Sequence, residues 1–198
     1  MSEIKSKRQS LTFSKYADNV KTILQKYEFD TEFIDDNIGL VVEATGEYDN
    51  LSTSSNIKKD NITISEAVPV VRLTTNRMSK KVIGVISKIE KNNERRENKI
   101  SSSFVGVVDK DKNRFWINSI GEGAIWVCNS NGNIENGDYL QSSNIKGYAE
   151  KQNDDLLHNY TIGKITCDVD FNNISEYTNK TLADGTICAF VGLIYHCG

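Results

Sequence analysis

From residue 37 onward, the chain alternates between short runs rich in β-branched and aromatic residues and clusters of Gly, Asn, Asp and Ser. This punctuation is typical of strands joined by tight turns. Nine such runs occur with almost no helical spacing between them, which predicts an all-β domain of meander or barrel-like form. The runs are 38–44, 67–75, 81–90, 102–109, 114–120, 123–129, 138–143, 160–169 and 186–197.

The segment before residue 37 has a different pattern. Residues 1–12 are polar and basic, which predicts a flexible arm. Across 13–36, apolar side chains recur at helical spacing and Ser14 is a suitable N-cap, so we predict a short N-terminal helix. The helix would lie on the β-rich domain 37–198 or pack against its own copies in an oligomer. Its stripe consists of Tyr16, Val20, Ile23, Leu24 and Tyr27.

The glycine-rich stretch WINSIGEGAIWVCNSNGNIENGDYLQSS (116–143) suggests either a phosphate-binding loop or a series of turns. A phosphate cradle needs a helix N-terminus directly after the glycines, whereas the β-type run AIWVCN follows Gly123. We therefore predict tight reversals at Asn131-Gly132 and Asn136-Gly137, where both central residues would adopt positive φ. A third bend is predicted over Gly121-Glu122-Gly123.

The same region resembles a known family. The block INSIGEGAIWVCNSNGNIENGDYLQSSNIKGYAEKQNDDLLHNYTIGKI is similar to the C-terminal domain of phage neck-appendage and tail-fibre proteins and of related giant-virus proteins. IGLVVEATGEYDN, ISEAVPVVRLTT, KKVIGVISKIE and AFVGLIYHCG fall in the order of that family, so the resemblance covers roughly residues 37–198. In phages this domain is an intramolecular chaperone that cleaves itself from the fibre. The resemblance implies a β-rich homotrimer that belongs to a virion or to its assembly pathway.

The sequence departs from this family at the cleavage site. Self-cleaving members carry an acidic and aromatic stretch of the type D-Y-A-E-Y-F just ahead of the domain. The nearest match here, SKYADNVK (14–21), has Asp18 but no second carboxylate one turn away. The segment YEFDTEFIDD (27–36) is acidic and aromatic in a different order. Because such a site needs one group to accept a proton and another to donate it or attack, we predict that self-cleavage is absent.

Composition narrows the function classes. The chain has 198 residues and a formal charge of −3, so no bulk positive field favours nucleic acid. No apolar run approaches the roughly 20 residues that span a bilayer, and the N-terminus lacks the apolar core of a secretory signal. We therefore expect a protein made in a cytoplasm, with no membrane span. The family resemblance implies that this is a host cytoplasm and that the final location is the virion.

The four cysteines are far apart and no C-x-x-C motif occurs. Each lies in or beside an apolar run, which predicts buried thiols that act as small hydrophobic side chains. A zinc site that combines Cys197 with His196 or His158 is disfavoured because the local ligand spacing is missing. We predict no metal and no cofactor.

Six residues are candidates for chemistry or binding. Asp154, Asp155 and His158 come closest to a catalytic set, but no nucleophile accompanies them, so loop capping and a hydrogen-bonded surface histidine are predicted. Glu122 is predicted to be a buried carboxylate that holds backbone amides. Trp116 and Trp126 are predicted to lie in the core or in a subunit interface, with stacking on sugars as the alternative.

These observations favour a non-enzymatic viral structural protein, a trimeric β-domain that decorates a capsid or forms a fibre head beside other virion proteins. Two alternatives remain open at this point. One is a self-cleaving peptidase that chaperones fibre trimerisation. The other is a glycan-binding module at a fibre tip.

Overall fold

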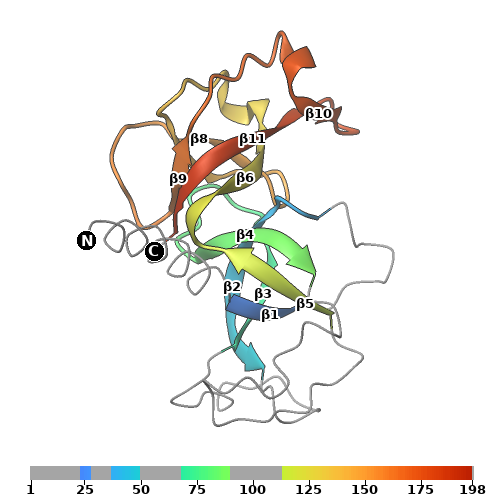
Figure 1. Cartoon of the computed structure of the whole chain (residues 1–198), viewed down its shortest axis with the longest axis vertical. Helices are drawn as coiled ribbons and strands as arrows, with labels where there is room; N and C mark the ends of the chain where they lie inside the picture. The colour runs from blue at the N-terminus through green and yellow to red at the C-terminus, as the bar shows by residue number, and fades with distance from the viewer. Residues whose placement is uncertain (1–22, 28–36, 50–67, 90–112, 198) are drawn as a thin grey trace, which may run out of the picture.

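The structure is a computed structural model that describes residues 23–27, 37–49, 68–89 and 113–197. These residues form two β-sheets with almost no helix, which confirms the all-β prediction. The first five strands gather in the lower half of Figure 1, and β8 to β11 gather in the upper half. The 102–109 run and the 1–12 arm lie outside the described residues.

The first five strands make a closed barrel in the order β1-β3-β2-β4-β5. Closure leaves no exposed edge, because β1 pairs with both β3 and β5. Pro69, the second residue of β3, sits at a strand start in this barrel rather than on an edge strand. The barrel strands are β1 (Ile23–Tyr27), β2 (Val41–Asp49), β3 (Val68–Leu73), β4 (Val82–Ile89) and β5 (Asn113–Asn118).

The remaining strands make a six-stranded sheet in the order β10-β11-β6-β8-β7-β9. An additional pairing of β9 with β11 brings five of these strands into a second ring. The long strand β11 is its centre, since it pairs with β6, β9 and β10. The strands are β6 (Ile120–Cys128), β7 (Tyr139–Ser142), β8 (Ala149–Lys151), β9 (Thr161–Ile165), β10 (Thr178–Thr181) and β11 (Ile187–His196).

Two buried clusters join the sheets. One fills the second ring and includes Val41 and Val85 from the barrel. The other combines barrel residues such as Leu40 with Cys128 and Cys188 of the second sheet. Backbone bonds reinforce this contact: the Val41 amide donates to the Gly147 carbonyl, and the Gly147 amide donates to Thr74, both at 2.8 Å. Each of the two clusters therefore contains residues from both sheets.

The predicted N-terminal helix is wrong at residues 23–27, which form strand β1. The helical spacing of this stretch is overridden because β3 and β5 both need a partner to close the barrel, and β1 supplies it. The remainder of the 13–36 prediction lies outside the described residues.

The bend predicted at Gly121-Glu122-Gly123 also differs from the structure, where β6 runs through all three residues. The strand is interrupted instead at Ser119, two residues before Gly121, between the end of β5 and the start of β6. Gly123 is required for another reason: a Cβ there would lie 2.5 Å from Cε2 of the buried Tyr195. The Tyr195 hydroxyl then donates to the Ala124 carbonyl at 2.6 Å. The glycine makes room for a ring that crosses the strand.

The two Asn-Gly reversals are present but differ from the predicted type. Gly132 (φ 79°) follows a 3-10 turn at Asn129–Asn131, and Gly137 (φ 101°) ends a turn in which the Asp138 amide donates to Glu135. In these two turns only the glycine has a positive φ. Met78, which lies in neither turn, is the sole non-glycine with positive φ among the described residues. Glycine therefore occupies the one position in each turn where another residue would be strained.

Because the interior holds ionisable side chains, we expect the folded chain to lose stability at alkaline pH. Burial raises the pKa of Cys188 and of Cys197 to about 12, and raises that of Tyr195 well above its ordinary value. The folded chain thus holds these protons more tightly than the unfolded chain, whose thiols ionise near 9.0. Their contribution to stability is complete below pH 9.0 and is lost as the pH rises toward 12.

In that window we expect each thiol to lower the free energy of unfolding by up to about 1.4 kcal/mol per pH unit. Urea unfolding at a series of pH values measures this slope. As a control, Cys188→Ala should show a shallower dependence than the parent chain. Urea midpoints that stay constant up to about pH 11 would contradict the prediction.

Candidate functional site

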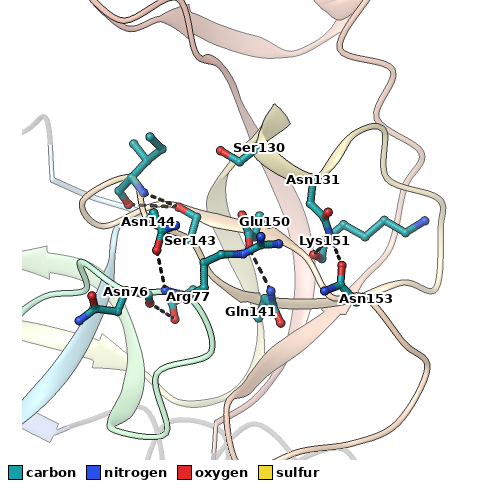
Figure 2. A network of polar contacts seen from close by, with 12 residues as sticks. Asn76, Arg77, Ser130, Asn131, Gln141, Ser143, Asn144, Glu150, Lys151 and Asn153 are labelled. Carbon is teal, nitrogen blue, oxygen red and sulfur yellow. Dashed lines mark hydrogen bonds and ion pairs between the residues drawn. The ribbon is translucent and has the colours of Figure 1, made fainter.

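A polar junction connects the turn after β3 to the second sheet (Figure 2). Arg77 donates through Nε to Oε1 of Glu150, and Gln141 donates to the same oxygen at 2.9 Å. The Arg77 amide donates to Asn144 Oδ1 at 3.1 Å. Glu150 is only 1% exposed, so this carboxylate depends on the arginine for its counter-charge.

The other end of the same turn binds a second buried carboxylate. Ser79 Oγ donates to Glu43 Oε2 at 2.5 Å, while Arg72 Nε donates to Oε1 at 2.8 Å. The Ser79 amide donates to Ser142 Oγ at 3.0 Å. Between these anchors Met78 has a φ of 54° and a side chain that is 46% exposed. The turn is a clamp between the sheets, and the carboxylates serve that structural purpose.

A loop over residues 153–160 presents two leucines to solvent. Leu156 is 64% exposed and Leu157 is 63% exposed. The buried amide of Gln152 holds the loop from beneath, donating to the Asp154 carbonyl at 3.0 Å and to the Leu156 carbonyl at 2.6 Å. Thr161 Oγ1 donates in turn to Gln152 Oε1 at 2.7 Å. The leucines therefore stand on a preorganised frame, and we call this segment the leucine loop.

Asp154 and His158, two of the predicted candidates, belong to this frame. His158 Nε2 lies 3.0 Å from Asp154 Oδ1, and its ring stacks on Tyr160 with centroids 4.6 Å apart. The Leu156 amide, followed by His158 and Gln152, holds the pKa of Asp154 below its ordinary value. Asp155 is exposed in the same loop. The contacts of Asp154 and His158 are those of loop capping.

An exposed sheet face lies where β6, β11 and β9 run together. Ile120 faces His196, Glu122 faces Ile194, and Ile194 also faces Lys164 of β9. Residues directly opposite each other on antiparallel strands point to the same side, so these side chains form one surface. The two isoleucines are 52% and 45% exposed. We call this surface the outer face; it comprises Ile120, Glu122, Tyr139, Lys164, Ile194 and His196.

The outer face is mixed in character. The Tyr139 and His196 rings meet edge to face with centroids 6.4 Å apart, and Lys164 Nζ lies 5.4 Å from the Tyr139 centroid. Glu122 is exposed here, so the prediction that it is a buried carboxylate holding amides is wrong. Its place on β6, opposite Ile194, turns it toward solvent.

Both tryptophans are half-buried. Trp126 donates through Nε1 to the Ile38 carbonyl at 3.1 Å and packs against Phe190, with ring centroids 5.2 Å apart. Lys180 Nζ lies over its ring at 4.2 Å, which occupies a face that a sugar would need. Trp116 lies on β5, with Lys88 Nζ 5.2 Å from its ring centroid.

The remaining sequence predictions concern self-cleavage, metal binding and membrane spans. The two segments compared with the family's cleavage motif, 14–21 and 27–36, lie outside the described parts of the chain except for Tyr27. Within those parts, no three His, Cys, Asp or Glu side chains gather so that they could hold a metal ion. Nor does any helix found there have the length and apolar character needed to cross a membrane.

No family model, curated protein or solved structure matches the chain. The candidate site therefore rests on its own geometry. It has two parts: a hydrogen-bonded loop that projects leucines and a sheet face that exposes isoleucines.

Proposed function

We propose that this chain is a non-enzymatic structural subunit of a virion, a trimeric β-domain that decorates a capsid or forms a fibre head. Support comes from the family resemblance of residues 117–165 and from the all-β architecture of that block. The capping contacts of Asp154 and His158 also favour a structural purpose over catalysis.

The observation that carries the trimer is the pairing of two unlike exposed apolar features. The five large hydrophobic side chains exposed in the described residues are Met78, Ile120, Leu156, Leu157 and Ile194. Four of them fall into the leucine loop and the outer face. Isolated apolar side chains are ordinary on protein surfaces, but two exposed apolar pairs, one on a hydrogen-bonded loop and one on a sheet face, indicate contact with protein.

Charge around the two features is complementary at one point. Asp154 and Asp155 flank the leucines, while Lys164 lies opposite Ile194 on the outer face, which also carries Glu122. We infer that the leucine loop of one copy docks on the outer face of the next. Because the two surfaces differ, the contact is heterologous, and such contacts produce a ring when the rotation closes. Three copies would close the ring of the proposed trimer.

Light scattering on the purified full chain tests this. We expect the mass of a trimer at micromolar concentration. A loop variant, Leu156→Ser with Leu157→Ser, and a face variant, Ile120→Ser with Ile194→Ser, should each be monomeric. Mixing the two variants should give a one-to-one heterodimer, since one intact loop then meets one intact face.

The matched control is Met78→Ser, which removes an exposed apolar side chain outside both surfaces and should leave the trimer intact. A monomeric parent chain would contradict the trimeric subunit itself. A trimer that persists in both double variants would instead reject only this interface. Mass spectrometry of purified particles tests the virion assignment separately, because the chain must be present there in high copy number.

A further inference from the structure

Two of the four cysteines stand directly opposite each other in the second sheet. Cys128 is the last residue of β6, and Cys188 is the second residue of β11. The antiparallel register of these strands pairs Cys188 with Cys128. Both are free thiols and both are fully buried. Figure 1 shows β6 and β11 side by side over their length.

This register satisfies the spacing of a disulfide. Opposite residues of antiparallel strands have Cα atoms about 4.5 or 5.5 Å apart, and a disulfide accepts roughly 4.4–6.8 Å. The two side chains also point to the same face of the sheet. The next pair on that face, Trp126 and Phe190, packs ring against ring at 5.2 Å, and both cysteines belong to one buried cluster.

The surroundings of the thiols slow their reaction with glutathione, because both are buried and the thiolate of Cys188 is disfavoured, so a disulfide between them would form through local opening of this end of the sheet. Burial, followed by the nearby Cys128 sulfur, raises the pKa of Cys188 to about 12. Cys128 Sγ lies 3.2 Å from Oγ of the exposed Ser130, just beyond the end of β6. The other two cysteines have different environments: Cys197 Sγ donates to the Ile162 carbonyl, and Cys167 is half-buried after β9.

We propose that Cys128 and Cys188 are a latent cross-strand disulfide, which forms when the folded chain meets a small-molecule disulfide such as oxidised glutathione. One cysteine thiolate attacks a glutathione sulfur, forming a mixed disulfide and expelling one reduced glutathione. The second cysteine attacks the bonded protein sulfur and expels the other glutathione. The chain loses two electrons and two protons, and the two released glutathione thiolates take them up.

The disulfide would join the start of β11 to the end of β6. At this point β11 also pairs with β10 on its other side, where Cys188 lies opposite Lys180. Residues 129–187, which include β7 to β10, would lie within the closed loop. A crosslink across a loop of this length constrains the unfolded chain strongly. A particle released from a reducing cell would thereby gain a more durable domain without any change of fold.

The test uses the full chain, purified in reductant and then equilibrated with glutathione buffers of increasing oxidising poise. Free thiols are alkylated, and the digested protein is mapped by mass spectrometry. We expect a peptide linked between Cys128 and Cys188, with Cys167 and Cys197 alkylated. The thermal midpoint should rise by about 5–10 °C on oxidation and fall back with dithiothreitol.

Cys167→Ala should retain the link and the thermal shift, whereas Cys188→Ala and Cys128→Ala should each lose both. The mapping on the parent chain is decisive even if a variant folds poorly. Four alkylated thiols at the most oxidising poise would overturn the proposal. So would links to Cys167 or Cys197, or glutathione that stays attached to Cys128.

Discussion

Replacing Gly163 with alanine is expected to lower the free energy of unfolding by about 3 kcal/mol. Gly163 lies in β9, where this strand pairs with β7 on one side and β11 on the other. A Cβ at this position would lie 2.4 Å from the Ile194 carbonyl oxygen and 2.9 Å from Leu193 Cδ1. The first obstacle is backbone, which cannot move without separating β9 from β11. Urea unfolding followed by circular dichroism measures the loss.

Gly192→Ala in β11 is the matched control, since neither glycine has a positive φ. Its added Cβ would meet Thr166 Oγ1 at 3.2 Å, and that side chain can rotate away. We expect a change below about 1 kcal/mol. Equal losses in the two variants would mean that crowding by the backbone is not what requires glycine at 163.

The strands that the sequence predicts well are those whose own residues favour extended backbone. Runs such as VPVVRL of β3 and ICAFVGLIYH of β11 are β-branched and aromatic, and they form strands where the pattern places them. The strands β8 (AEK) and β10 (TNKT) lack that signal. They are extended because neighbouring strands accept their hydrogen bonds, which no local pattern reveals.

Glycine was ambiguous for the same reason. Gly121 and Gly123 predict a bend because glycine often marks turns, yet Gly123 is needed for the ring of Tyr195, which lies far along the chain. The Cys128–Cys188 pair likewise depends on the register of β6 against β11. Contacts between distant segments are set by topology, so a single sequence without a known register cannot supply them.

The sequence predicts the two candidate surfaces, the leucine loop and the outer face, only in part. The charges of the segment NDDLLHNY predict loop capping, and Asp154 and His158 do meet as loop-capping groups. The two leucines between them were the stronger signal, because an apolar pair within a polar loop must be either buried or offered to a partner. The outer face could not be predicted, since it needs three strands that are separated in sequence to lie together.

The second large effect is expected at the polar junction. Arg77→Ala should lower the free energy of unfolding by about 3 kcal/mol, because it removes the counter-charge of a carboxylate that stays buried. Glu150 would keep the Gln141 amide as partner, while its Oε2, which already has no hydrogen-bond partner, gains none. The main-chain bond from residue 77 to Asn144 and the Ser79 bonds would remain, so the clamp would be weakened but not removed. Chemical denaturation of the parent chain and the variant measures the difference.

A double variant separates charge from packing. Adding Glu150→Gln to Arg77→Ala removes the buried charge while keeping the shape of the side chain, so part of the lost stability should return. Lys151→Ala is the surface control: its ion pair with Asp138 (2.7 Å) is partly exposed, and the expected loss is below about 1 kcal/mol. If the double variant is less stable than Arg77→Ala alone, the uncompensated charge of Glu150 is not the cause. The loss would then come from the packing of the arginine stem against the second sheet.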